Sequence, residues 1–157
     1  MMTTFIGDHI CKVDAKGRVL FPSAFKKQMS SAMQDHFVVK KDIYEECLVL
    51  YNMEEWQRQN DIIRANINPY NREHNKFIRG FYNGSAEVSL DSSNRILIPK
   101  RLLEQAGIDK DVVLSGQDTK IEIWSKEKYE DISGGGDDFA NLAEKIMGGN
   151  ITGKERE

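Results

Sequence analysis

Two short stretches of the chain share one pattern of apolar and polar positions. Residues 12–22 read KVDAKGRVLFP and residues 89–99 read SLDSSNRILIP. In each, an apolar residue precedes an aspartate, three turn-forming residues, an arginine, three apolar residues and a proline. The matched residues, always 77 positions apart, are Asp14 with Asp91, Arg18 with Arg95, and Pro22 with Pro99. Such self-similarity indicates an internal repeat.

The similarity continues beyond the prolines at a slightly shorter spacing. Residues 37–39 resemble residues 112–114, and residues 48–51 resemble residues 121–124, which lie 73 positions later. The first unit therefore has extra residues near its first helix and loop. Each unit is predicted to contain a strand, a tight turn, a strand, a proline, a short helix, two further strands and a second short helix.

The two hairpin turns are predicted to have the same backbone shape. The last residue of a three-residue hairpin loop usually has a positive φ, which glycine adopts most easily and asparagine next. Gly17 and Asn94 both occupy this position. Pro22 and Pro99 cannot donate to a central ladder, so each is expected to end its strand and open a helix.

A helical region is predicted between the two units. Asn52 and Glu55 form a capping box before a helix at 53–65, and a second helix is expected at 72–82. The glycines of 133–136 predict a flexible linker, and residues 137–147 are expected to form one amphipathic turn or two. We divide the chain into a first repeat at 4–60, linking helices at 61–83, a second repeat at 84–132 and a flexible C-terminal tail at 133–157.

Composition and charge narrow the class of protein. Of the 157 residues, 39% are apolar and 30% are charged, which is typical of a soluble globular protein. No apolar run is long enough to span a membrane and the N-terminus lacks a signal-peptide pattern, so we expect a cytoplasmic protein. The net charge of −3 does not itself indicate nucleic acid, but residues 1–40 are locally basic.

Catalytic and metal-binding patterns are weak. The chain contains no GxSxG, P-loop or HExxH motif, and we expect no enzymatic activity, no cofactor and no small-molecule substrate. His9 and Cys11 have the spacing of metal ligands on a strand, but the repeat aligns them with Ala86 and Val88, so core packing is favoured and no metal site is predicted. The adjacent acids Glu54 and Glu55 are interpreted as solvated surface.

The repeated aspartate and arginine allow two interpretations. In the first, each aspartate holds its turn and pairs with the arginine, so the motif is structural. In the second, the arginines form a two-fold basic face that contacts phosphates and base edges of DNA, since a guanidinium bonds guanine O6 and N7 together. The predicted DNA-contacting residues are Arg18, Lys16 and Arg95, helped by Lys12, Lys26, Lys27, Lys100 and Arg101.

These paired motifs closely resemble the DxxxR signatures of the MraZ family. The opening segment Thr4–Gly7 and the link Gly80–Ala86 also resemble that family. The resemblance covers residues 4–132 and implies an α+β, β-rich fold of the AbrB-like, swapped-hairpin type. In that fold two half-units form one pseudo-two-fold small barrel, with extra helices between the halves. The family's DNA contacts would fall on Lys16, Arg18 and Arg95. The second copy has Ser93 at the place of Lys16, which predicts a weaker phosphate-binding half.

Two functions follow from these observations. The resemblance implies a nucleoid-associated transcriptional regulator that assembles into homo-oligomeric rings and binds short promoter repeats in double-stranded DNA upstream of the cell-division and cell-wall gene cluster. A ring showing one basic patch to several repeats would gain affinity by effective concentration. The alternative is a ring-forming protein interaction module in which the DxxxR hairpins are purely structural. No membrane partner is expected.

Overall fold

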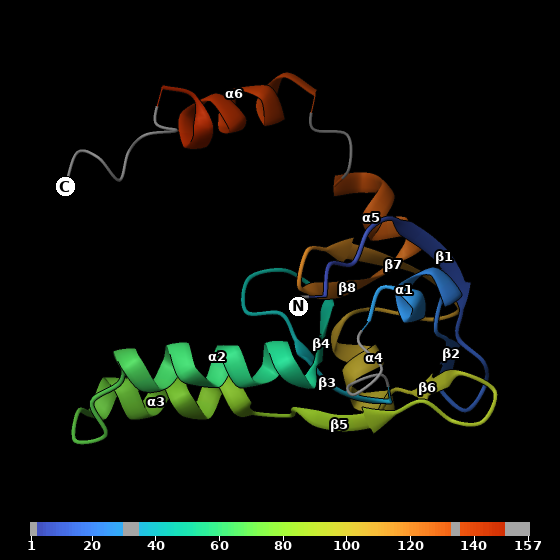
Figure 1. Cartoon of the computed structure of the whole chain (residues 1–157), viewed down its shortest axis with the longest axis horizontal. Coiled ribbons are helices and arrows are strands. Elements are labelled where there is room, and N and C mark those ends of the chain that lie inside the picture. The colour runs from blue at the N-terminus through green and yellow to red at the C-terminus, as the bar shows by residue number, and fades with distance from the viewer. Residues whose placement is uncertain (1–2, 30–34, 133–135, 150–157) are drawn as a thin grey trace. The chain divides into compact units, whose positions relative to one another are not determined.

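A computed structural model describes residues 3–29, 35–132 and 136–149. The chain forms two compact units, residues 1–126 and residues 127–157. The first unit is a mixed α+β structure in which a mostly antiparallel sheet is combined with several helices (Figure 1). None of the helices in the described segments combines the length and the apolar character that crossing a bilayer requires.

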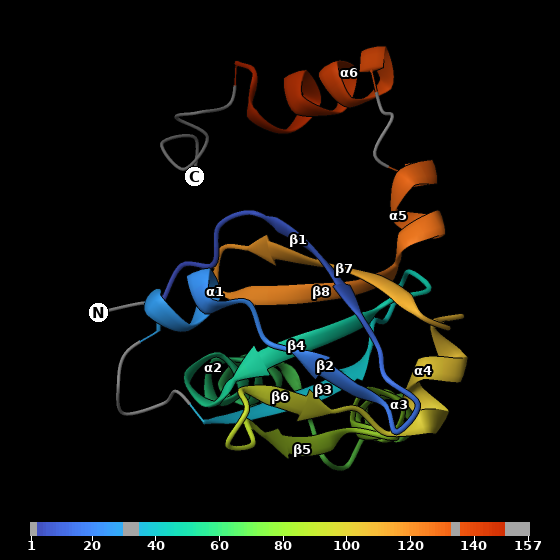
Figure 2. The same ribbon diagram turned by 90° about the vertical axis from the view of Figure 1, so that its right-hand side faces the viewer.

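The larger sheet has six antiparallel strands. In spatial order they are β1 (Asp8–Lys12), β7 (Asp111–Gln117), β8 (Lys120–Ser125), β4 (Leu48–Asn52), β3 (His36–Lys41) and β5 (Ala86–Ser89). A separate ribbon pairs β2 (Arg18–Leu20) with β6 (Arg95–Leu97), and Figure 2 shows these two strands side by side.

β3 pairs with β4 and β7 pairs with β8 within a half, and the other strand pairs join the two halves of the sequence. β1 pairs with β7, β5 pairs with β3, β4 pairs with β8 and β2 pairs with β6. Neither half could therefore form its sheet alone. In the described part of the chain the ladder runs from β1 to β5 without returning to β1, so the predicted closed barrel is not confirmed.

A proline precedes the short helix that follows each ribbon strand. α1 (Ser23–Lys27) begins directly after Pro22, and α4 (Lys100–Gln105) begins directly after Pro99. Each proline carbonyl accepts two backbone hydrogen bonds from the first turn of its helix. The missing proline N–H costs nothing at a helix start, which explains the placement.

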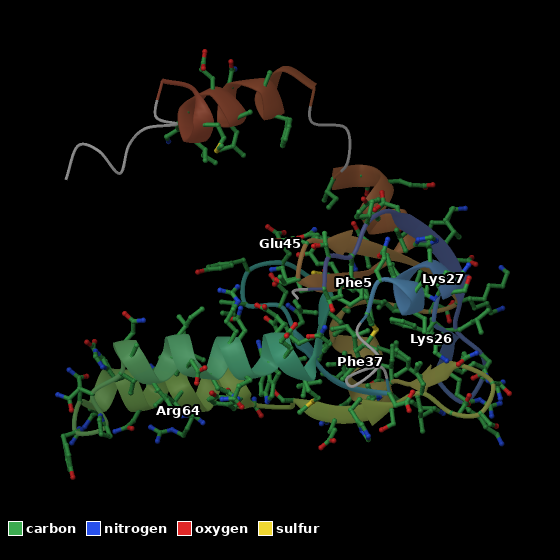
Figure 3. All side chains as sticks on the ribbon, in the orientation of Figure 1. Phe5, Lys26, Lys27, Phe37, Glu45 and Arg64 are labelled. Carbon is green, nitrogen blue, oxygen red and sulfur yellow. The ribbon has the colours of Figure 1, made fainter. Side chains whose placement is uncertain are left out.

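The core lies between the sheet, the ribbon and the two short helices. Val19 and Ile96 on the inner face of the ribbon are fully buried, as are Phe25 of α1 and Leu102 of α4. Phe37 of β3 points into the same core, and burial of one such side chain contributes about 1.5–3 kcal/mol (Figure 3). The core thus fixes the ribbon on the side opposite to its exposed face.

The predicted packing of the first strand is partly right. His9 lies half-buried with its ring edge-on to Phe25, at 4.7 Å between centroids. Cys11 is half-buried and packs against the core. Their repeat counterparts Ala86 and Val88 also pack against or within this core.

Between the halves, α2 (Met53–Asn66) and α3 (Arg72–Tyr82) lie side by side as a helical hairpin (Figure 1). Asn52 caps α2 by accepting the backbone N–H of Glu55 at 2.8 Å. The other half of the predicted capping box is wrong, because the Glu55 carboxylate instead bonds Arg58 at 2.9 and 3.0 Å. Glu55 was interpreted as solvated surface, but its side chain is buried. Its charge is compensated there by the ion pair with Arg58.

The second unit contains α5 (Lys126–Ile132) and α6 (Gly136–Met147). The segment 137–147, where only one amphipathic turn or two was expected, thus belongs to a longer helix. α6 presents exposed apolar residues, among them Phe139, Leu142 and Ile146. The predicted linker at 133–136 lies mostly outside the described residues.

Candidate nucleic-acid interface

The β2–β6 ribbon places both motif arginines on one exposed face. In its antiparallel register Arg18 lies opposite Leu97, Val19 opposite Ile96, and Leu20 opposite Arg95. Directly opposed residues point to the same side of a ribbon and successive residues alternate. Since Val19 and Ile96 point into the core, the outward face consists of two arginines and two leucines.

The hairpin turn of each half is held by the other half. The Gly17 carbonyl accepts the backbone N–H of Ile98, and the Asn94 carbonyl accepts the backbone N–H of Phe21, both at 2.9 Å. Gly17 has φ +91° and Asn94 has φ +60°, the left-handed region that the turn pattern predicts. A Cβ on Gly17 would lie only 2.8 Å from the Ile98 carbonyl oxygen, so this position also requires the absence of a side chain.

The two aspartates organise the turns in the same way. Asp14 Oδ1 accepts the backbone N–H groups of Lys16 and Arg18, each at 2.9 Å. Asp91 Oδ1 accepts those of Ser93 at 2.8 Å and Arg95 at 3.0 Å. These bonds, led by the one from the Arg18 backbone, lower the pKa of Asp14 to about 2. The backbone N–H of Arg95 is likewise the main cause of a lowered Asp91 pKa.

The two arginines differ in how closely they contact their aspartates. Arg18 Nε donates to Asp14 Oδ2 at 2.7 Å. Arg95 Nε lies 3.4 Å from Asp91 Oδ2, and its Nη1 lies 3.9 Å from Asp14 Oδ2. Within the described segments, Arg95 Nε is buried and has no hydrogen-bond partner. Arg95 Nε is thus held by the ion pair with Asp91 rather than by a hydrogen bond of good geometry.

The predicted lysines and Arg101 are distributed around this face. Lys26 of α1 donates to the Asn94 side chain at 2.7 Å, which joins it to the second turn. Lys12 pairs with Asp111 at 2.8 Å, and Arg101 donates to the Gly84 carbonyl at 3.1 Å. Lys16, Lys27 and Lys100 are exposed. Figure 3 shows Lys26 and Lys27 at the opposite end of the first unit from Arg64.

A cavity of about 420 Å³ lies beside the first turn. Its lining includes Lys12, Lys100 and Lys110, but also Asp14, Glu104 and Asp109, so the charges are balanced. This lining does not favour an anion over a cation.

One further group of residues has metal-ligating side chains close together. The ligand atoms of Asp42, Cys47 and Glu122 lie within 4.8 Å of one another. Burial raises the pKa of the Cys47 thiol to about 12, with Glu122 and Asp42 adding to the effect. The thiol is therefore protonated at neutral pH, which disfavours it as a ligand. This group lies in the β3–β4 loop and the adjoining strands, outside the ribbon.

The sequence interpretation missed Leu20 and Leu97 as surface residues. They are 56% and 55% exposed, although both belong to runs of three apolar residues. The signal was present in strand alternation. Once Arg18 points outward, Val19 must point inward and Leu20 outward.

The fold and the paired Asp–Arg turns define an α+β protein whose two-stranded ribbon carries two arginines on one face. Comparison with protein families matches residues 4–76 and 81–146 to the model described as "MraZ protein, putative antitoxin-like". A protein of Christiangramia forsetii is 47% identical over 151 residues, covering 94% of this chain and 95% of its own length. Proteins of Flavobacterium psychrophilum and Bacteroides fragilis are 43% and 40% identical, over 94% and 93% of this chain and 94% and 92% of their own lengths.

All three relatives are named transcriptional regulator MraZ. The chain belongs to the MraZ family. The resemblance in the DxxxR motifs is thus confirmed across nearly the whole chain. The family name indicates a regulator rather than an enzyme.

Proposed function

We propose that the chain is a sequence-specific DNA-binding transcriptional regulator that contacts DNA through the exposed face of the β2–β6 ribbon. The observation that supports this most strongly is the pair of outward arginines on opposed strands. A two-stranded ribbon fits the major groove of B-DNA, where arginine bonds guanine O6 and N7. Arg18 and Arg95 are the base-contacting residues.

The aspartates orient the arginines until DNA is bound. Asp14 contacts the Arg18 guanidinium through Nε alone. Among the described residues no hydrogen bond occupies the two Nη groups of Arg18. The terminal nitrogens thus remain available for a base edge. Holding a long side chain in place before binding reduces the entropy lost on association. The carboxylates act as positioning groups, not as DNA contacts.

The exposed lysines supply phosphate contacts, which contribute affinity without sequence information. Lys16 lies on the first turn, and Lys27 lies at the end of α1, the helix that follows β2. Ser93 replaces Lys16 on the second turn, so the second half binds phosphate more weakly. Lys12, Lys26 and Arg101 are already bonded within the protein and have smaller roles.

The wider setting follows from family membership. The cross-pairing of strands between the halves supports a swapped-hairpin arrangement with an approximate two-fold axis through the ribbon. We propose that copies of the chain assemble into rings on short promoter repeats of the cell-division and cell-wall gene cluster, at the nucleoid. A single ribbon makes few base contacts, so several ribbons on several repeats would be needed for tight binding.

A fluorescence-anisotropy titration tests the proposal. The full chain is titrated against a duplex obtained by selection from a random pool and against a scrambled duplex, at two salt concentrations with competitor DNA. The proposal requires a signal for the selected duplex that survives the competitor. Equal binding to both duplexes would leave the alternative, a ring-forming protein interaction module with structural hairpins.

A further inference from the structure

We propose that Leu20 and Leu97 determine sequence specificity by contacting the C5-methyl groups of thymines beside the guanines that Arg95 and Arg18 bind. This inference rests on the proposed function and deepens it. It assigns the ribbon a composite recognition surface, in which each arginine and the leucine opposite it read neighbouring base pairs.

The two leucines hold equivalent positions. They are 77 residues apart, and their exposures differ by only one percentage point. Each lies directly opposite the arginine from the other half of the chain. The exposed apolar surface therefore occurs twice, once in each half, and always next to a motif arginine.

The structure packs these leucines only in part, since Leu20 borders a hollow with Ile10 and Cys11 of β1 and Leu97 lies over the first turn. Val19 and Ile96, the residues between the outward positions, fill the core below the ribbon. Leu97 Cδ1 lies 3.7 Å from where a Gly17 Cβ would be, so the side chain lies over the turn of the other half. More than half of each leucine nevertheless remains open to solvent.

The chemistry of the major groove supplies one matching group. Among base edges there, only thymine presents an apolar substituent, its C5-methyl. Opposed side chains on a ribbon have Cβ atoms about 4.5–5.5 Å apart, and stacked base pairs are about 3.4 Å apart. An arginine and its opposed leucine can therefore reach adjacent base pairs, so the preferred site should hold a guanine next to a thymine.

Charge decides between DNA and other occupants of this face. The leucines are flanked by Arg18 and Arg95, each paired with the aspartate of its own turn, and the exposed Lys16 of the first turn adds a further positive charge. A second copy would bring identical arginines against these, and like charges directly opposed are unfavourable. A polyanion with apolar methyl groups fits both the charge and the leucines.

The test removes the methyl groups from DNA rather than only the leucines from the protein. The selected duplex is prepared with thymine and again with deoxyuridine, which lacks the C5-methyl. Wild type and the double variant Leu20→Ala, Leu97→Ala are titrated against both. We expect wild type to lose roughly three- to fivefold in affinity per contacted methyl on the deoxyuridine duplex. The double variant should bind both duplexes equally.

A matched control is Ile62→Ala, which removes an exposed apolar side chain from α2, outside the ribbon. This variant should keep the wild-type ratio of affinities for the thymine and deoxyuridine duplexes. Circular dichroism and light scattering report whether each variant keeps its fold and its oligomeric mass. If the double variant does not fold, the two single variants replace it. Each should discriminate between the thymine and deoxyuridine duplexes less strongly than wild type.

Three outcomes overturn the inference. Wild type could bind both duplexes equally, or the double variant could still discriminate as strongly as wild type. The leucine substitutions could also change the oligomeric mass and leave the ratio intact, which would make the face a contact between copies. An Arg18→Ala variant separates the two proposals, because its loss of selected-duplex binding supports the proposed function whatever the methyl groups do.

Discussion

The Gly17 carbonyl accepts the backbone N–H of Ile98 at 2.9 Å, and this bond joins the first turn to the strand end of the second half. The reciprocal bond runs from Phe21 to Asn94. Neither turn can move without disturbing the opposite strand. The two arginines are consequently fixed relative to each other before any partner binds.

Gly17→Ala should destabilise the fold. The new Cβ would lie 2.8 Å from the Ile98 carbonyl oxygen at a backbone φ of +91°, so both space and conformation are unfavourable. We expect a loss of about 1–3 kcal/mol in the free energy of unfolding, measured by urea denaturation. Gly80→Ala is the matched control, since a Cβ there, in the last turn of α3, meets nothing within 4 Å. It should stabilise by about 0.5–1 kcal/mol.

Arg18→Ala should weaken binding to the selected duplex by about 1–3 kcal/mol and relax the base preference at one position. Arg18→Lys keeps the charge but loses the planar fork, so it should retain most of the salt dependence and little of the specificity. Arg64→Ala, on α2 far from the ribbon, serves as control. Anisotropy at several salt concentrations measures all three, and equal losses in Arg18→Ala and Arg64→Ala would contradict the site.

Asp14→Asn should remove an acid-sensitive contribution to stability. The pKa of Asp14 is lowered from 3.8 to about 2 in the folded protein, so its carboxylate stabilises the fold above pH about 4. This contribution is lost as the pH falls from about 4 to about 2. The difference in unfolding free energy between wild type and variant should therefore shrink over that interval. A difference that stayed constant with pH would show that the charge of the Asp14 carboxylate, with its backbone hydrogen bonds and its ion pair to Arg18, contributes nothing to stability.

The two cysteines should react with thiol reagents at very different rates. Cys47 is fully buried and burial raises its pKa to about 12, whereas Cys11 is half-buried with a pKa raised by desolvation alone. Because the thiolate is the reactive form, labelling of the native protein at pH 8 should modify Cys11 first. Cys47 should react only after denaturation. Mass spectrometry of Cys11→Ala checks the assignment, and rapid labelling of that variant would contradict it.

Much of the fold follows from local signals in the sequence. The prolines before α1 and α4, the positive φ at Gly17 and Asn94, and the Asn52 cap are each determined by a single residue and its neighbours. Such features depend on backbone geometry alone, so residue type is sufficient to place them.

The partners of the strands and side chains were less accessible from sequence. Glu55 was expected at the surface, but it pairs with Arg58 because the helix start lies against the sheet. The apolar runs do not themselves distinguish Leu20 and Leu97 from the core residues beside them, and only the ribbon register shows that they point outward. Arg101 was assigned to the basic face, yet it bonds Gly84. These outcomes depend on tertiary contacts that short patterns do not contain.

One consequence follows from the helical hairpin that joins the two halves in one chain. A symmetric dimer of half-units would present identical turns and would favour palindromes, in which neither direction is distinguished. Here Lys26 holds the second turn through Asn94, while Leu103, its counterpart, packs beside Gly17. The two ends of the ribbon therefore differ, and the ribbon has a polarity along the DNA. A regulator of the proposed kind would be matched to repeats that all run in one direction.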